Sequence, residues 1–212
     1  AGYNDLNQFS VPFPNYWRDY DRLPGVATEH TMYTDTTKLW KYAATSRKLT
    51  NVDKKGEAWD ETFRPWKFAD DAKTGDRGTT AKITFHFWDQ SQANYGVTWT
   101  YDAESNSYKR ANGGSPHMDK NNSKQVTAKN VVVVVADEAD ANDGYEGGHL
   151  LYELEGSGTA YIFQNGEAIK GTWNKADFED AMVFEDAKGN EIEFVRGQVF
   201  VSIIPTGNKV TF

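Results

Sequence analysis

The chain has 212 residues, with 31 acidic and 23 basic side chains, a net charge of −8 and no cysteine. This charge argues against nucleic-acid and anionic-membrane partners, which would repel an acidic chain at long range. Without cysteine there is no disulfide, thiolate metal site or cysteine nucleophile. At about 150 residues per domain, the length allows one large domain or two small ones.

The apolar runs of the chain are short. The longest, residues 131–136, is far below the roughly 20 residues that span a bilayer, so the chain as given is not expected to be transmembrane. It begins at Ala1, without Met and without a signal-peptide pattern. We therefore expect a processed chain or a piece of a longer one.

Aromatic residues and proline dominate residues 1–33. Pro12 and Pro14 block a regular helix and favour extended geometry in the residues before them, which predicts an irregular or edge segment. A helix is expected next, because apolar residues recur at spacings of three and four after residue 35. Either Asp35 or the threonine before it can cap the start of this helix. We expect this helix to end near Arg47.

The remainder of the chain predicts a loop followed by strands. Residues 50–80 are polar and interrupted by glycine and proline, which is typical of a loop. From residue 81 the apolar residues alternate, as in half-buried strands, and residues 89–94 are expected to join the first two. The strands are expected at residues 83–87, 95–101, 108–110, 149–154, 158–163, 167–173, 183–184, 192–194 and 199–204.

Residues 131–135 are a continuous β-branched run, which predicts a strand buried on both faces. Asn165-Gly166 predicts a tight hairpin, because both central positions of a type I′ turn need positive φ. A second hairpin is expected to turn at residues 188–190. The fold class that follows is α+β and mainly antiparallel β, with a meander, barrel-like or sandwich body. Residues 1–80 are expected to hold an aromatic arm, the helix and a loop, and residues 81–212 the β domain.

The loop that begins at Gly113 holds the densest group of reactive side chains. Ser115, His117 and Asp119 follow it at alternate positions. This pattern is typical of a ligand-binding loop, or of a hydroxyl nucleophile beside an imidazole base; the alternative is a tight turn whose histidine caps a strand. Because a serine two residues from a histidine does not match a nucleophile elbow, ligand contact is favoured over catalysis.

An acidic loop over residues 137–146 is the candidate metal site. Calcium prefers several oxygen ligands on a flexible loop, and Glu138, Asp140 and Asn142 have the spacing of the first three ligands of an EF-hand. Asp143 then stands where that motif has glycine. A solvated hairpin loop is therefore the default, with calcium as the alternative, and no other cofactor is expected.

No other pattern in the sequence points to a reaction. The four histidines are too scattered for a zinc site, and the many carboxylates have no spacing specific to glycosidases. No phosphate loop, dinucleotide fingerprint or zincin helix is present. Exposed Trp and Tyr side chains would suit a carbohydrate or peptide platform, although most aromatics are expected in the core.

The stretch Asn112-Gly113-Gly114-Ser115-Pro116-His117-Met118-Asp119 belongs to a longer series of motifs. The other members are residues 16–19, 29–34, 65–68, 127–133, 156–161, 165–166 and 171–173. Taken in this order, the motifs resemble those of the bacterial YerB-like putative lipoprotein family, a domain of unknown function. The resemblance covers nearly the whole chain and corresponds to the second half and C-terminal domain of that family.

The resemblance implies an extracytoplasmic bacterial protein, secreted or tethered to the cell envelope, and it implies no reaction. Two departures stand out: Glu29 replaces the proline expected before the histidine, and family members carry a further N-terminal region ahead of residues 1–40. The residues on recurring motifs, taken with Ser115, are the candidate ligand-binding set. They are Trp17, Arg18, Asp19, His30, Ser115, His117 and Asp119.

Three functions remain open. The favoured one is a non-enzymatic module that binds a cell-wall glycan, a peptide or a small solute, because the motif residues concentrate in loops and aromatic stretches on a β scaffold. The second is a cell-envelope hydrolase or transferase with His117 and His30 as acid–base groups, although no residue is assigned as catalytic. The third is a structural subunit that self-associates through strand edges.

Overall fold

The computed structural model describes residues 5–58, 60–61, 63–88 and 92–212. The chain divides into two compact units, Ala1–Thr62 and Phe63–Phe212. The loop expected at residues 50–80 is therefore shared between them, and residues 63–80 belong to the second unit. No helix in the described ranges is both long and apolar enough to span a bilayer.

The first unit is a short hairpin followed by a helix. β1 (Tyr16–Arg18) pairs antiparallel with β2 (Met32–Thr34), and the 3₁₀ helix η1 (Thr28–Thr31) precedes β2. Both strands are edge strands of a two-stranded sheet, which agrees with the expected irregular or edge segment, and Trp17 stacks with Tyr33 across the pair. The helix α1 (Thr36–Thr45) begins as predicted at Asp35, whose carboxylate accepts a hydrogen bond from the Lys38 backbone N–H at 3.1 Å.

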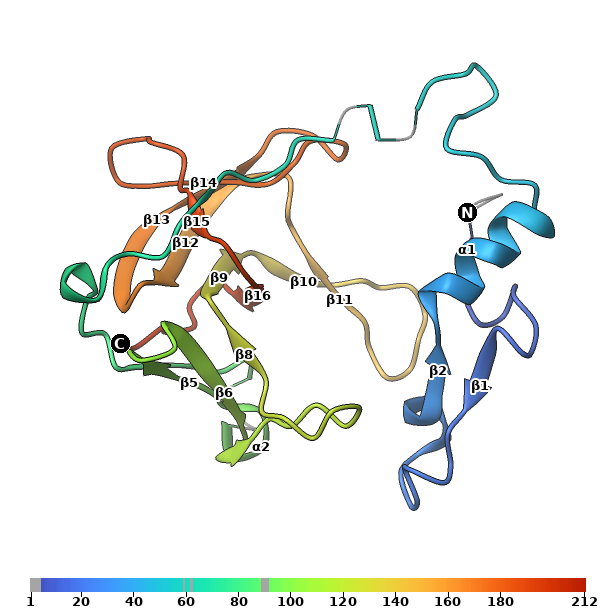
Figure 1. Ribbon diagram of the computed structural model, residues 1–212, viewed down its shortest axis with the longest axis horizontal. Helices are drawn as coiled ribbons and strands as arrows, with labels where there is room; N and C mark the ends of the chain where they lie inside the picture. Colours follow the sequence, from blue (N-terminus) through green and yellow to red (C-terminus); the bar gives the residue numbers. More distant parts are fainter. Residues whose placement is uncertain (1–4, 59, 62, 89–91) are drawn as a thin grey trace. The chain divides into compact units, whose positions relative to one another are not determined.

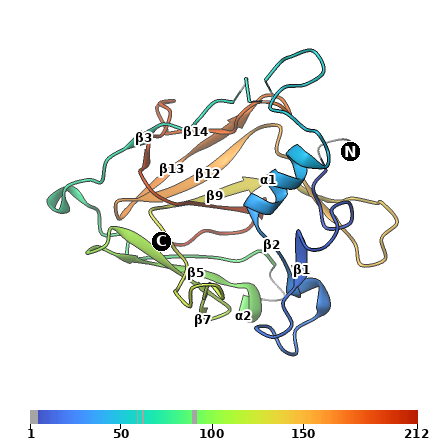
Figure 2. The same ribbon diagram turned by 45° about the vertical axis from the view of Figure 1, so that its right-hand side comes forward.

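The larger sheet of the second unit has five strands (Figures 1 and 2), and Figure 2 shows its central members side by side. All neighbours are antiparallel except the last pair, which is parallel. In spatial order the strands are β14 (Val183–Glu185), β13 (Glu167–Lys175), β12 (Gly156–Gln164), β9 (Asn130–Ala136) and β16 (Val199–Pro205).

The smaller sheet is built from the segment between residues 82 and 128, where β8 joins it by pairing with β6. The short helix α2 (Gln92–Tyr95) lies between its first two strands, and residues 89–91 of the expected connection fall outside the described residues. The strands are β4 (Lys82–Phe85), β5 (Val97–Asp102), β6 (Ser107–Asn112), β7 (Ser115–Pro116) and β8 (Thr127–Ala128).

Two further strand pairs and a short 3₁₀ helix also belong to the second unit. β3 (Phe68–Ala69) pairs in parallel with β15 (Phe194–Val195), and β10 (Glu138–Asp140) pairs antiparallel with β11 (Leu150–Tyr152). The 3₁₀ helix η2 (Thr74–Asp76) follows β3. None of the sheets in the described ranges closes into a barrel.

The core consists of two apolar clusters on opposite faces of β9. Val131 and Val133 face the smaller sheet, where they pack with Trp99 and Tyr108. Val132 and Val134 face the other way, toward a cluster that includes Phe194. The four valines from 131 to 134 are fully buried. This confirms the predicted strand with two buried faces, and with it the α+β, mainly antiparallel fold class.

The second predicted hairpin is only partly present. Gly189 has the positive φ of a turn residue, and the backbone N–H of Ile192 donates to Phe184 O at 2.7 Å. Beyond this point the chain leaves the hairpin, because Asn130 holds Val195 through two hydrogen bonds of 2.8 Å. The Asn165-Gly166 turn is confirmed, with φ of 52° and 70°.

Replacing Asn130 with Ala should lower the free energy of unfolding by about 2–4 kcal/mol, because the change leaves buried backbone groups of residue 195 without partners. Asn130 is fully buried and also donates to Gln198 O at 3.3 Å. Urea denaturation followed by tryptophan fluorescence measures the loss. Asn121→Ala, at an exposed turn position, is the control and should change the value by less than about 0.5 kcal/mol. Equal losses in the two variants would contradict the assignment.

Candidate functional site

Arg110 is a buried cation at the centre of the smaller sheet. The alternation of β6 places its side chain on the same face as Tyr108, toward the core, and it is only 7% exposed. The guanidinium carbon lies 5.9 Å from the ring of Trp99, the partner of Arg110 across β5, and 5.2 Å from the ring of Phe200 on β16. Both rings therefore offer their π-electrons to the charge.

The polar contacts of Arg110 leave most of its donors unused. One Nη donates to Nδ1 of His117 at 2.6 Å, and the other donates to the Asn112 side-chain oxygen at 3.3 Å. The buried Nε–H has no hydrogen-bond partner in the described part of the chain. Since an arginine side chain carries five N–H donors, three of them find no acceptor there.

His117 is held in one protonation state and one tautomer. Arginine can only donate, so Nδ1 must accept, and the proton of the neutral ring lies on Nε2. Burial lowers the pKa of His117, and the positive charge of Arg110 lowers it further. Backbone bonds fix the ring on the sheet, because the N–H of His117 donates to Arg110 O at 2.9 Å. The half-buried ring thus directs an N–H donor away from the cation.

No carboxylate of the described residues forms an ion pair with Arg110. Burial lowers the pKa of its guanidinium, with no acidic side chain acting in the other direction. A buried charge without a counter-ion is costly in a low-dielectric interior. The cluster of Arg110, Asn112 and His117 therefore has the electrostatics of an anion site, which we call the arginine site.

A hollow of about 520 Å³ lies against the smaller sheet, near the turn that follows β6. Gly113, Gly114 and the side chains of Thr84 and Lys209 are among its lining residues. Asn112 links the arginine site to the α2 segment beside this hollow, because its Nδ2 donates to Asn94 O at 3.1 Å. A Cβ on Gly113 would meet Asn94 O at 2.6 Å, so this close approach requires glycine.

The other two predicted residues of this loop have structural surroundings. Ser115 lies on the exposed strand β7, and in the described residues its hydroxyl forms no bond with His117. The carboxylate of Asp119 closes the following turn by accepting from the Asn121 N–H and the Asn122 side chain, both at 2.8 Å. The structure thus brings His117 together with Arg110.

The remaining ligand-binding candidates belong to the first unit, and their side chains contact neighbours there. Trp17 stacks with Tyr33 at a centroid distance of 6.4 Å. Arg18 donates to Thr28 O, and Asp19 pairs with Arg22. His30 is exposed in η1. Trp17, Arg18, Asp19 and His30 thus lie near the same hairpin, apart in the chain from the arginine site.

The acidic loop lies between β10 and β11. Glu138 accepts a hydrogen bond from Tyr152, whose pKa burial and this carboxylate raise to about 12. Asp140 and Asn142 line a hollow of about 460 Å³ that does not include Glu138. In the described residues, no three His, Asp or Glu side chains are grouped to hold a metal ion. Calcium at this loop stays a prediction.

The same hollow contains a hydrogen-bonded pair that the sequence pattern did not single out. His149 Nδ1 and Asp143 Oδ2 lie 2.6 Å apart, and Tyr145 stacks on the imidazole at 4.3 Å between ring centroids. The hydrogen bond with His149 lowers the pKa of Asp143. Both partners are about half exposed, so water screens the pair and its contribution to stability is small.

Arg110 itself was absent from the predicted set. The available signal was the alternation of the strand expected at residues 108–110, which places an arginine on the same face as a core tyrosine. A charged residue at a core-facing position is rare and needs an explanation. Its partners came from two other segments, however, and their proximity has no signature in the sequence.

Comparison with known proteins gives one consistent result. The model of the family described as "Protein of unknown function (DUF3048) C-terminal domain" matches residues 83–201, which is more than half of the chain. The "Putative lipoprotein YerB" of Bacillus subtilis (strain 168) is 23% identical over 192 residues, which make up 90% of this chain and 51% of that protein. The chain thus spans about half the length of this curated relative.

The crystal structure of the YerB protein from Bacillus subtilis superimposes with a TM-score of 0.69 and 20% identity. The match covers 96% of this chain and 62% of that one. At this level of identity the likeness establishes the fold. Together with the family match, it confirms the resemblance that the sequence motifs indicated.

In folded protein, His117 should titrate with a pKa below its ordinary value of 6.5. Arg110→Met removes the neighbouring positive charge, so the pKa of His117 should rise toward that value while the effect of burial remains. Because the folded pKa is depressed, the stability tied to neutral His117 is complete above about pH 6.5 and is lost as the pH falls toward the folded pKa. Imidazole NMR resonances followed over pH measure the shift.

The matched control is Lys109→Met, which removes a positive charge from the opposite face of β6, where Lys109 pairs with Asp102. This variant should leave the pKa of His117 unchanged. An unchanged pKa in Arg110→Met would show that the guanidinium does not act on the imidazole.

Proposed function

Because the chain belongs to the family described by the DUF3048 C-terminal domain, whose function is unknown, we propose its role from the site: it is a binding module of the bacterial cell envelope. The module holds the anionic group of its ligand at the arginine site. The observation that carries this proposal is that Arg110 is only 7% exposed and its guanidinium lacks a carboxylate partner in the described residues.

The chemistry of the ligand follows from the free donors. Guanidinium N–H groups form a planar fork that matches carboxylate or phosphate oxygens. The Nε2–H of His117 adds a neutral donor beside it. Trp99 and Phe200 surround the cation with apolar surface, which strengthens an ion pair by excluding water. A carboxylate- or phosphate-bearing glycan, peptide or solute has this chemistry.

The envelope location rests on the relatives. A protein named as a lipoprotein is similar over 90% of this chain, which supports an extracytoplasmic location, secreted or tethered. Cell-wall polymers in that compartment carry carboxylates and phosphates in abundance. The binding site and its location are thus consistent with each other.

Binding is favoured over catalysis by the surroundings of His117. Its Nδ1 is occupied by Arg110, and the added positive charge disfavours the protonated ring that a general base must become. Ser115, the nearest predicted nucleophile in sequence, forms no hydrogen bond with it among the described residues. A hydrolase or transferase would have to draw its base from elsewhere.

The proposal is tested by titrating the labelled protein with sodium acetate and, separately, sodium phosphate at constant ionic strength. We expect saturable changes in the NMR signals of the Trp99 indole and the His117 ring, in the millimolar range because single ions offer few contacts. The stronger of the two anions identifies the ligand group. Arg110→Met should abolish the saturable response.

Arg196→Met is the matched control, because Arg196 is exposed and pairs with Asp70 at the surface. It should leave both titrations unchanged. The proposal fails if neither anion produces a saturable response in the wild-type protein. It also fails if the response persists in Arg110→Met.

A further inference from the structure

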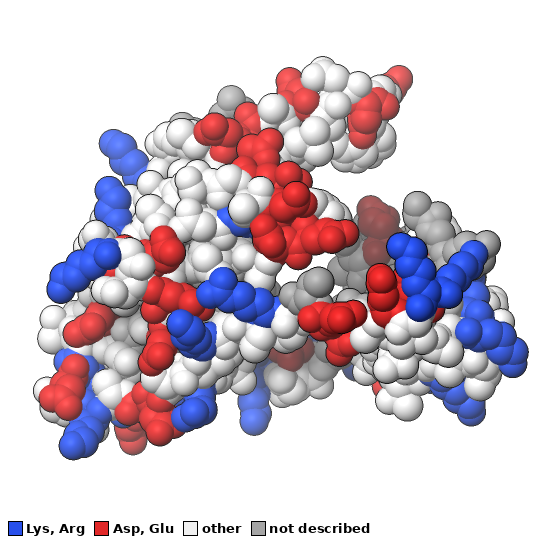
Figure 3. Space-filling view, turned by 90° about the horizontal axis from the view of Figure 1, so that it is seen from above, with Lys and Arg blue, Asp and Glu red and all other residues white. Residues whose placement is uncertain are grey.

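The charge of the chain is unevenly distributed. Residues 36–52, which include α1, carry four basic side chains and no acidic one, within a chain whose net charge is −8. Figure 3 shows Lys and Arg side chains gathered on part of the first unit. At physiological salt a charge acts over about 8 Å. The interaction of a partner with this segment therefore depends on the local positive charge and not on the net charge of the chain.

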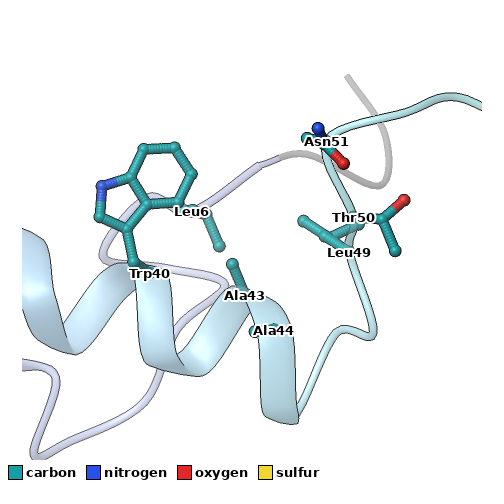
Figure 4. A pocket seen from close by; sticks show the side chains of 7 residues that line it. All are labelled: Leu6, Trp40, Ala43, Ala44, Leu49, Thr50 and Asn51. Carbon is teal, nitrogen blue, oxygen red and sulfur yellow. The ribbon is translucent and has the colours of Figure 1, made fainter. Parts of the chain in front are cut away.

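An apolar groove lies in the same segment. It has a volume of about 370 Å³ and lies between α1 and the chain that follows the helix, and Leu6 also lines it. Figure 4 shows Trp40 on one side of the groove and Leu49 on the other, with Ala43 between them. Trp40 is 62% exposed although it stands on a helix face next to apolar residues.

Basic residues are sequence neighbours of the residues that line this groove. Lys41 follows Trp40 and lies one helical turn before Ala44, a lining residue, while Lys48 directly precedes Leu49. Neither lysine forms an ion pair with a described residue, and both are exposed. Arg47 fixes the neighbouring loop, because its Nη2 donates to Ser10 O at 2.8 Å. The segment that follows α1 is thus tied to the N-terminal part of the same unit.

We propose that this surface docks on an anionic lipid bilayer. The exposed Trp40 and the apolar groove supply apolar surface for insertion, and exposed lysines on α1 and in the segment after it attract acidic headgroups. These are the two features of interfacial binding. An acidic protein partner would satisfy the lysines, but it would not need the exposed indole ring, which suits the boundary between water and hydrocarbon. The inference is independent of the function proposed for the arginine site.

The full chain should co-sediment with vesicles that contain phosphatidylglycerol and phosphatidylcholine, and should not do so with phosphatidylcholine alone. The double variant Lys41→Gln/Lys48→Gln should lower the partition coefficient more than tenfold, since each lysine near an anionic surface contributes about fivefold. Trp40→Ala should also weaken binding, and high salt should weaken the wild-type protein. All three substituted positions are exposed, so the variants should keep the wild-type circular dichroism spectrum.

Matched controls come from the second unit. Lys120→Gln/Lys124→Gln removes two exposed lysines from a turn, and Phe178→Ala removes an aromatic ring that is 79% exposed. Both should bind the vesicles as the wild-type protein does. Equal binding to the two vesicle types, or equal losses in variants and controls, would overturn the proposal. So would self-association that depends on Lys41 and Lys48 without any vesicle binding.

Discussion

The second unit depends on one strand that is buried on both faces. The four valines from 131 to 134 have no exposed surface, and alternate members face the two apolar clusters. Every element that packs on either side is therefore positioned relative to β9. The antiparallel partner β12 and the parallel partner β16 satisfy its backbone on both edges, which removes the cost of burying unpaired peptide groups.

Polar contacts at one end of β9 connect the two sheets. Asn106 is 2% exposed and has a φ of 48°. Its side-chain amide donates to the Asn165 side-chain oxygen at 2.8 Å and to the Asp71 carboxylate. Its side-chain oxygen accepts a hydrogen bond from the Tyr101 hydroxyl at 2.7 Å. Lys129 and Asn106 together lower the pKa of Asp71. These bonds join the turn after β5 to the turn after β12. The valine core thus sets which faces meet, and the asparagines fix their alignment.

The arginine site is a consequence of the same packing. Phe200 lies on β16, which is held beside β9, and Trp99 lies on the opposite sheet with its ring centroid 5.0 Å from that of Phe200. Arg110 enters at the margin of this contact, where the apolar layer ends and Asn112 and His117 begin. The core therefore provides the low dielectric surroundings that make an unpaired guanidinium attractive to an anion.

Patterns of short range were readable from the sequence. The helix after Asp35, the turn at Asn165-Gly166 and the doubly buried valine strand all follow from interactions between residues close in the chain. The brief β1–β2 pairing was missed, because three-residue strands carry too few positions for an alternation to be recognised. The parallel pairing of β16 with β9 could not be predicted from the sequence either, because the hydrophobic pattern of a strand does not encode the direction of a distant partner strand.

By itself the sequence determined the fold class and the family, because these rest on residue order and local spacing. It also predicted a ligand-binding loop around His117. The tertiary structure alone decided that Arg110 lies beside that histidine with no carboxylate partner among the described residues, since its surroundings combine residues from β5, β6 and β16. It also decided that Trp40 on α1 and Leu49 after it line one apolar groove, within a segment that carries four basic side chains and no acidic one. The net charge of the chain is a sum over all residues, whereas binding depends on the few charges within a Debye length of the partner.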